Sequence, residues 1–232
     1  MSEIDRIADV YRTYRETAAK QALWDEGNPG NQAILRERNS KTHKVLYSDG
    51  FLPLNGKKIL EVGCGTGKTL AGLVELGAEP QNLFGVDLLP DRIEEARSRY
   101  STFHFECGNA EKLNFPNASF DLILFFTVFS SILDGDMAKN VAAEAQRVLK
   151  AGGAMLWYDF RFNNPRNPNV RGIRKRDIKV LFPRLRMHLS TITLLPPLAR
   201  RLGRSVTFVY PILSTIPFLR THYLGLLIKA EP

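Results

Sequence analysis

ILEVGCGTGKTL, residues 59–70, is the stretch that decides the fold of this 232-residue chain. A short apolar run, KKILEV, leads into glycines at 63, 65 and 67, and a helical pattern, KTLAGLVEL, follows. Glycines let the backbone turn sharply and approach a ligand closely, and the free N–H groups at the start of the helix face that ligand. The carboxyl end of the first strand is where open α/β sheets bind ligands. The stretch therefore predicts a strand–turn–helix unit that holds a ligand.

The same alternation of strand and helix continues along the chain. Strands are predicted at 82–88, 102–107, 120–126 and 153–160, with helices over 91–100 and 136–150 between them. The run 120–126, FDLILFF, is almost continuously apolar, as in a strand buried on both faces. Alternation of this kind predicts a doubly wound parallel sheet, and two further strands are expected at 188–194 and 222–230.

Two helices are predicted ahead of this repeat. Ser2 and Asp5 form a capping box for an amphipathic first helix. Asn28 as N-cap and Pro29 in the first helical position begin a second helix that runs to about Tyr47. We divide the chain into an N-terminal helical cap, residues 1–50, and one ligand-binding domain, residues 51–232.

Three nucleotide-binding patterns compete for the glycine segment. A P-loop requires glycine where Val62 stands, and the dinucleotide fingerprint requires glycine where Lys68 stands. What remains is E-x-G-x-G-x-G, in which Glu61 precedes the first glycine by two positions.

EVGCGTG resembles the first motif of the class I S-adenosylmethionine-dependent methyltransferases, and the resemblance extends over roughly residues 57–160. It implies a mostly parallel seven-stranded sheet with helices on both faces, S-adenosylmethionine as cofactor and S-adenosylhomocysteine as product. In that family the glycine turn lies against the amino-acid and ribose parts of the cofactor, and the residue at Glu61 supports the loop and the methionine amino group. Asp87 ends the second strand, where a carboxylate can accept hydrogen bonds from both ribose hydroxyls.

A second segment, CGNAEKLNF (107–115), is similar to the family's G-D-A-x-x-L-P-F, with Asn109 in place of the aspartate that recognises adenine. The amide oxygen can still accept a hydrogen bond, but the charge is lost. QRVLKAGG resembles the late motif R-V-L-K-P-G-G, with Ala151 replacing proline. The predicted cofactor-binding residues are Glu61, Gly63, Cys64, Gly65, Thr66, Gly67, Asp87, Leu88, Asn109, Ala110, Glu111 and Phe126.

The methyl acceptor is expected beyond the ends of the fourth and fifth strands. The histidine that many small-molecule relatives carry after strand four is missing from FFTVFSSILD. A general base stays open, with Asp159, Tyr158 and His222 as catalytic candidates. No metal site is predicted, because neither Cys64 nor Cys107 lies in a CxxC pair or beside a histidine cluster.

The loop RFNNPRNPNVRG, residues 161–172, offers planar hydrogen-bond donors suited to phosphate, carboxylate or sugar hydroxyls. Tyr11, Tyr14 and Trp24 form either a lid or part of the core. The candidates for binding the substrate are Trp24, Thr127, Arg161, Asn164 and Arg171.

Charge is unevenly distributed. Residues 161–232 hold 14 Lys and Arg against 2 Asp and Glu, whereas residues 1–160 hold 18 against 22, and the whole chain is at +8. Such an excess indicates either a surface for an anionic partner or a solvated basic face. The charged N-terminus has no apolar core typical of a signal peptide, and no stretch has the ~18–20 apolar residues of a membrane span. We therefore expect a cytoplasmic protein.

Several functions are compatible with these features. The leading expectation is O-methylation of a small polar acceptor such as a sugar, glycan unit or secondary metabolite. The acceptor can itself carry an anionic group such as phosphate. C-methylation of a quinone or another lipid-linked ring is the alternative, because apolar LLPPL and FVYPILSTIPF beside arginines suit a membrane surface. RNA methylation is less favoured, since no Asn/Asp-Pro-Pro-Tyr/Phe motif follows strand four, and a non-catalytic cofactor-binding scaffold is the fourth reading.

Overall fold

The structure is a computed structural model that describes residues 2–17, 21 and 25–231. Trp24, one of the predicted substrate-binding and lid residues, lies outside the described residues. Seven strands form one sheet in the order β3-β2-β1-β4-β5-β7-β6. Their bounds are β1 (Ile59–Val62), β2 (Leu83–Asp87), β3 (His104–Cys107), β4 (Phe120–Phe126), β5 (Leu149–Phe160), β6 (Leu185–Leu194) and β7 (Arg220–Lys229).

The strand order places the ligand site at β1. β1 pairs in parallel with β2 on one side and with β4 on the other, so the order of strands reverses there. β7 runs antiparallel between β5 and β6, and the remaining pairs are parallel. The predicted doubly wound, mostly parallel sheet is confirmed, and the crevice at its switch point lies beyond the carboxyl end of β1.

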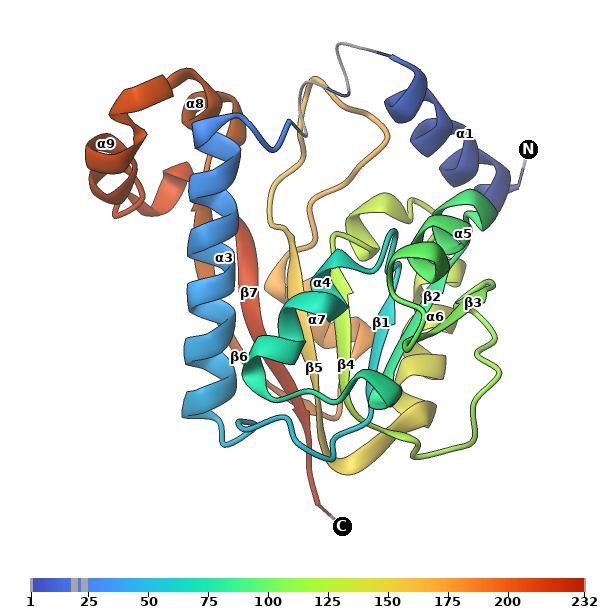
Figure 1. The fold of residues 1–232 in the computed structure, drawn as a ribbon. Coiled ribbons are helices and arrows are strands. Elements are labelled where there is room, and N and C mark those ends of the chain that lie inside the picture. The colour runs from blue at the N-terminus through green and yellow to red at the C-terminus, as the bar shows by residue number, and fades with distance from the viewer. Residues whose placement is uncertain (1, 18–20, 22–24, 232) are drawn as a thin grey trace.

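Helices cover both faces of the sheet (Figure 1). They are α1 (Glu3–Glu16), α3 (Pro29–Ser48), α4 (Lys68–Leu73), α5 (Pro90–Arg99), α6 (Gly135–Val148), α7 (Lys175–Leu181), α8 (Pro196–Arg201) and α9 (Val206–Leu213). The predicted starts of the first two are confirmed: Ser2 and Asp5 form the capping box, and the Asn28 side chain accepts hydrogen bonds from the two N–H groups that follow Pro29. Local capping chemistry therefore sets these boundaries.

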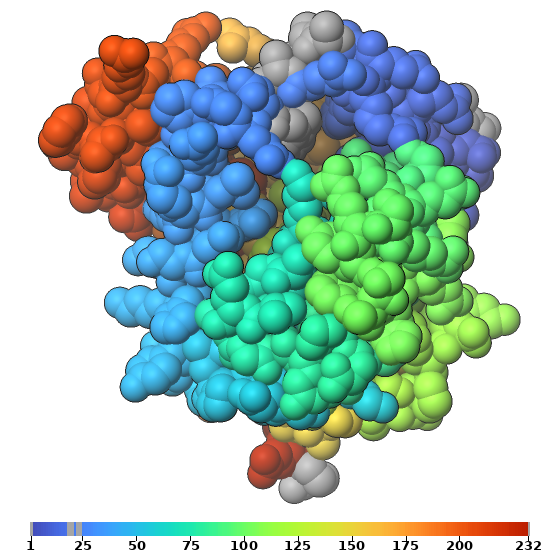
Figure 2. All heavy atoms as spheres, in the orientation of Figure 1, coloured from blue at the N-terminus to red at the C-terminus, as the bar shows by residue number. Residues whose placement is uncertain are grey.

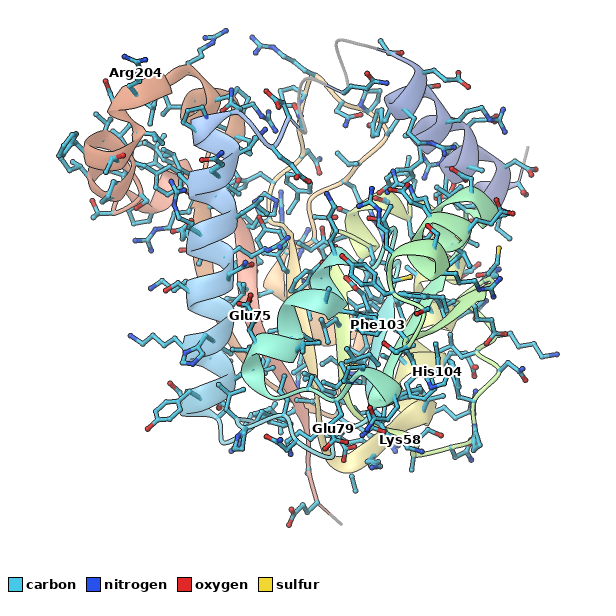
Figure 3. The ribbon with its side chains drawn as sticks, in the orientation of Figure 1. Lys58, Glu75, Glu79, Phe103, His104 and Arg204 are labelled. Atoms are coloured by element: carbon cyan, nitrogen blue, oxygen red, sulfur yellow. The ribbon has the colours of Figure 1, made fainter. Side chains whose placement is uncertain are left out.

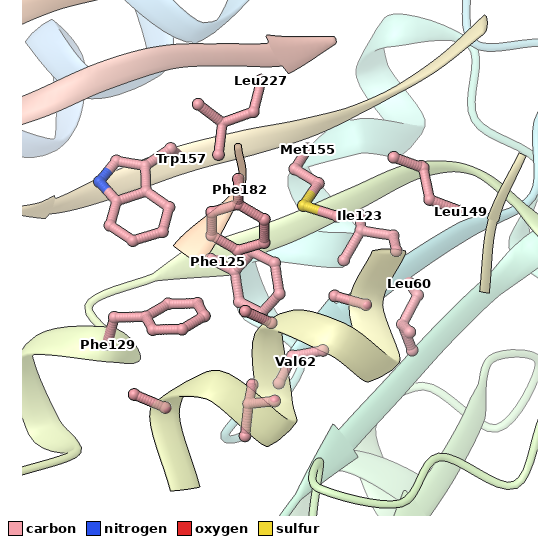
Figure 4. Packing of buried hydrophobic residues seen from close by; sticks show 14 of the residues in the cluster. Leu60, Val62, Ile123, Phe125, Phe129, Leu149, Met155, Trp157, Phe182 and Leu227 are labelled. Atoms are coloured by element: carbon pink, nitrogen blue, oxygen red, sulfur yellow. The ribbon is translucent and has the colours of Figure 1, made fainter. Parts of the chain in front are cut away.

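Alternate residues of each strand point to opposite faces, which gives two cores. On one face, Phe125, Trp157 and Leu227 pack with Phe129 and Phe182 beside α6 and α7 (Figure 4). On the other face the strands pack against α3, α4 and α5. The neighbouring ring centroids of Phe129 and Trp157 lie 5.0 Å apart. Packing of this density holds the carboxyl edge of the sheet rigid.

The structure corrects one strand boundary. β5 begins at Leu149, whereas the sequence predicts a helix to residue 150 and a strand only from 153. Leu149 already pairs with Phe120, and the register shifts before Ala154 pairs with Leu122. The extra residues of β5 between these two pairs form a bulge that contains Gly152 and Gly153, and Gly152 has a φ of +72° there.

The N-terminal helices do two different things (Figure 1). α3 runs along the sheet and buries Leu46 completely in the core. α1 lies instead over the carboxyl edge, where it contacts the segment after β4 through Tyr11 and Ser131. The domain boundary at residue 50 stays a prediction. None of the described helices is both long and apolar enough to cross a membrane.

Gly225 provides a test of the sheet. It pairs with Trp157 of β5 and Leu189 of β6, and a Cβ atom there would overlap the His188 carbonyl oxygen. We expect Gly225→Ala to lower the free energy of unfolding by about 2 kcal/mol, as overpacking does. The matched control is Gly72→Ala in α4, where a Cβ meets no atom within 4 Å. It should raise stability by about 0.5–1 kcal/mol. Urea unfolding measures both, and equal effects would contradict this packing.

Candidate cofactor and acceptor site

A cavity of about 800 Å³ lies at the carboxyl edge of β1, β2 and β4, under α1. Its size is typical of small-molecule sites, which span roughly 300–1,000 Å³. Seven of the twelve predicted cofactor-binding residues line it: Gly63, Gly65, Asp87, Leu88, Asn109, Ala110 and Phe126. The other five lie outside the lining: Glu61, Cys64, Thr66, Gly67 and Glu111.

The turn between β1 and α4 depends on its glycines. Gly63, Gly65 and Gly67 have φ values of +71°, +52° and +78°, in the left-handed region that disfavours side chains. A Cβ at Gly63 would also lie 2.9 Å from a methyl carbon of Val128. The turn therefore leaves bare backbone facing the cavity.

Asp87 joins this turn to the end of β2. Its Oδ2 accepts a hydrogen bond from the Gly65 N–H at 2.8 Å, and its Oδ1 accepts one from the Leu89 N–H at 3.0 Å. A carboxylate has further lone pairs, and Asp87 lines the cavity. It can therefore hold the turn and accept hydrogen bonds from ligand hydroxyls at the same time.

Glu61 is buried, with 2% of its surface exposed. Its Oε2 has no hydrogen-bond partner among the described residues. Burial raises the pKa of Glu61 from 4.5 to about 8, although the positive charge of Arg38 acts in the opposite direction. A buried, unpartnered carboxyl oxygen beside a glycine turn fits a cationic group of a ligand. This is the feature expected if the turn holds the amino-acid part of S-adenosylmethionine.

Asn109 and Glu111 brace each other at the end of β3. The Asn109 carbonyl oxygen accepts from the Glu111 N–H at 3.0 Å, and its amide donates to the Glu111 carboxylate at 2.8 Å. Asn140 donates to the other Glu111 oxygen. The amide oxygen keeps a second lone pair, so Asn109 can still receive a hydrogen bond, while Glu111 supports the loop from behind.

Cys64 has a structural role. It is buried, burial raises the pKa of its thiol, and its sulfur fills the space that a side chain at Gly85 would occupy. It packs β1 against β2 without lining the cavity.

α1 closes the cavity. The Tyr11 hydroxyl lies 3.0 Å from the Ser131 hydroxyl, and Asn167 donates to the Tyr14 hydroxyl at 2.9 Å. Both tyrosines line the cavity, together with Ile7. Tyr11 also packs against the main core that contains Ile7, so the lid and core alternatives both stay predictions.

Arg92 is a cavity residue that the sequence analysis missed. Its guanidinium lies 5.5 Å from the Tyr11 ring centroid, and its Nε is buried without a hydrogen-bond partner among the described residues. Its Nη1 would lie 3.2 Å from a Cβ at Gly65. The signal in the sequence was its position in the first turn of the helix after Asp87. Arg92 brings a positive charge to the cavity.

The three catalytic candidates lie away from the lining. Asp159 has no exposed surface and accepts hydrogen bonds from the Ser130 and Phe160 N–H groups at 3.0 and 2.8 Å. Burial raises its pKa to about 6. The Tyr158 hydroxyl lies 3.0 Å from the Thr193 hydroxyl, and burial raises its pKa to about 12.

His222, the third candidate, stacks on Tyr158 with ring centroids 4.6 Å apart. Burial lowers the pKa of this histidine to about 3, so the ring is neutral. Its Nδ1 lies 2.9 Å from the Thr221 hydroxyl. Tyr158, Asp159 and His222 therefore form part of the buried framework around β5 and β7.

The substrate candidates divide in the same way. Thr127 and Asn164 line the cavity. Arg161 instead donates to the Pro217 carbonyl at 3.2 Å and lies over the Phe162 ring, and the Arg171 backbone N–H donates to Ser130. Neither arginine belongs to the lining.

The cavity wall is mainly apolar and contains no evident base. Among the lining residues that the structure describes, Asp87 is the only carboxylate, and none is histidine, lysine or glutamate. The positive charges come from Arg15 and Arg92. The geometry can therefore bind and enclose a ligand, but offers little proton-transfer machinery.

Comparison with known proteins agrees with this geometry. Residues 59–153 match the family model described as a methyltransferase domain. The chain has the fold of the class I S-adenosylmethionine-dependent methyltransferases. The domain shares its fold with the 1,6-didemethyltoxoflavin-N1-methyltransferase of Burkholderia thailandensis, solved with S-adenosylhomocysteine bound. That comparison has a TM-score of 0.64 at 15% identity and covers 98% of this chain and 88% of the other.

Two curated relatives of the methyltransferase domain show the range of acceptors. The O-methyltransferase cnsE of Penicillium expansum is 31% identical over 49% of this chain. The ubiquinone biosynthesis O-methyltransferase of Bartonella bacilliformis is 28% identical over 67% of this chain. The matches span only 41% and 61% of those two relatives.

Glu61 makes the stability of the methyltransferase domain depend on pH. The folded chain keeps the Glu61 proton up to a pKa of about 8, whereas the unfolded chain loses it near 4.5. The unfolded state therefore binds fewer protons in this window, so the free energy of unfolding should fall as pH rises through it. Glu61→Gln should flatten this slope in urea unfolding series. Asp136→Asn, an exposed control, should keep it, and an unchanged slope in Glu61→Gln would contradict the assignment.

Asp87 should determine cofactor affinity. We expect Asp87→Asn to raise the dissociation constant for S-adenosylhomocysteine at least tenfold, about 1.4 kcal/mol, because one carboxylate serves both the turn and the ligand. Calorimetry on the wild type, Asp87→Asn and the control Asp136→Asn measures this. Equal affinity in all three would remove Asp87 from the site.

Proposed function

We propose that this chain transfers the methyl group of S-adenosylmethionine to a small-molecule acceptor. The observation that carries the proposal is the bare glycine turn and the Asp87 carboxylate on one cavity, with the buried, unpartnered Glu61 oxygen behind that turn. Asp87 would accept from the ribose hydroxyls, Asn109 and Ala110 would lie at the adenine, and Glu61 would face the amino group. The cytoplasm stays the expected location.

Bound S-adenosylmethionine supplies a methyl group on a sulfonium, which already is a good leaving group. The protein then has to align the acceptor and exclude water. α1 provides the enclosure through the Tyr11–Ser131 and Tyr14–Asn167 hydrogen bonds. Thr127 and Asn164 line the cavity after β4 and β5 and are proposed to position the acceptor.

The residues that line the cavity limit the chemical class of the acceptor. With no histidine, lysine or glutamate among the described lining residues, an aliphatic alcohol would find no base to remove its proton. A phenol or enol is acidic enough to react with little help, and its anion would be stabilised by the positive charge of Arg92, since Arg15 already forms an ion pair with Asp91. We therefore propose O-methylation of a phenolic or enolic metabolite within the expected class of small polar acceptors. A sugar hydroxyl suits this wall less well.

C-methylation of an electron-rich, lipid-linked ring is the second candidate. The apolar wall formed by Ile132, Met137, Val141 and Val170 favours it. The RNA alternative stays a prediction.

A panel assay with labelled S-adenosylmethionine tests the acceptor. Phenols and enols should be methylated at least about 10²-fold faster than aliphatic alcohols of similar shape, the usual contribution of a general base. Asp159→Asn should lower stability while leaving the turnover number within about threefold, because Asp159 does not reach the cavity.

The outcomes of the panel assay separate the hypotheses. Equal rates on alcohols, abolished by Asp159→Asn, would replace this proposal with base catalysis by Asp159. Methylation at ring carbon would favour the second candidate. Calorimetry that detects NAD or ATP binding but no adenosyl ligand would overturn methyl transfer itself.

A further inference from the structure

α9 and the turn after it expose three large apolar side chains. Phe208 is 78% exposed, Ile212 67% and Phe218 75%. Single exposed apolar residues are ordinary on a protein surface. Three large apolar side chains exposed within eleven residues are unusual, and they indicate a contact with another molecule.

The exposure follows from the way α9 packs. Val206 and Tyr210 face inward, where they form a small core with Ala199, Leu194 and residues of α3. Phe208 and Ile212, four residues apart, share another face of the same helix. α9 is thus apolar on both its inner and outer faces, whereas an ordinary surface helix has a polar outer face.

The same lobe also carries positive charge. Arg201 and Arg204 are exposed, and the ion pairs among the described residues involve neither of them. Figure 3 shows Arg204 at the outer corner of the lobe that α8 and α9 form. No acidic residue stands between positions 178 and 230. The acid that does reach this lobe, Glu37 of α3, is turned inward and accepts from the Tyr210 hydroxyl at 2.8 Å.

The lobe stands at the functional edge of the sheet. β6 is parallel to β5 because both are antiparallel to β7, so α8 follows a carboxyl strand end, as the cavity does. The lobe protrudes beyond α3 at the same end of the molecule as α1 (Figure 2). A surface that contacts the lobe would therefore also lie near the covered edge of the cavity.

We propose that Arg201, Arg204, Phe208, Ile212 and Phe218, the docking surface, bind the protein to an anionic phospholipid bilayer. Protruding phenylalanines beside unpaired arginines match an interface in which apolar tips enter the acyl boundary and guanidinium groups meet lipid phosphates. A second copy fits less well, since two such surfaces face to face would oppose arginine to arginine. This inference does not depend on methyl transfer.

Vesicle sedimentation of the full chain tests the docking surface. The wild type should bind vesicles in which about a third of the lipid is phosphatidylserine at least tenfold more tightly than neutral phosphatidylcholine vesicles. Phe208→Ser with Phe218→Ser should weaken binding to the anionic vesicles at least tenfold, and Arg201→Gln with Arg204→Gln should do likewise.

Matched controls exclude effects of charge or polarity alone. Arg184→Gln with Arg186→Gln removes the same charge near the start of β6, and Val180→Ser removes a side chain that is 74% exposed on α7. Both should bind like the wild type. S-adenosylhomocysteine affinity should stay unchanged in every variant, which separates this test from that of the cofactor site.

Three results would overturn the proposal: no binding to anionic vesicles, equal loss of binding in the control variants, or a wild-type dimer in light scattering that becomes a monomer in Phe208→Ser with Phe218→Ser. The last result would assign the surface to a second copy of the chain. Binding to RNA that Arg201→Gln with Arg204→Gln abolishes, without any binding to vesicles, would assign it to nucleic acid.

Discussion

The hydrogen bond from the Gly65 N–H to Asp87 is the interaction on which the site depends. It ties the turn after β1 to the end of β2, at the point where the strand order reverses. The turn itself is left-handed at its glycines, a conformation that needs outside support to persist as one state. Because the supporting carboxylate also lines the cavity, the ligand meets a loop that is already in place. Binding therefore requires little ordering of the backbone.

One residue at this edge of the sheet lowers the stability of the fold. Glu61 lies in a strand that is buried on both faces, and its unpartnered oxygen costs free energy that an apolar residue would not. The aromatic packing of Phe125, Phe129 and Trp157 in the main core offsets this loss of stability. A buried polar atom without a hydrogen bond, in an otherwise well-packed region, is typical of a functional site.

Local chemistry made much of this structure predictable. The caps at Ser2 and Asn28, the glycines of the first turn and the continuous apolar run of β4 act over a few residues, and each prediction from them is confirmed. Asp159 and His222 could not be placed in this way. Their surroundings depend on β7 inserting antiparallel beside β5, which pairs Phe160 with His222 and buries the strand end that the sequence suggested was open. Arg92 stands close after Asp87 in the sequence, but its place over the Tyr11 ring follows only from the folded chain.

The segments that contact α1 also carry the residues proposed to bind the acceptor. Tyr11 binds the segment after β4 through Ser131, and Tyr14 binds the loop after β5 through Asn167. Those two segments also supply Thr127 and Asn164 to the cavity. A ligand can shift a conformational equilibrium only by binding one state better than another. If the acceptor binds Thr127 and Asn164 as proposed, ordering of these loops would also strengthen the contacts of α1, and acceptor binding and exclusion of water would be linked.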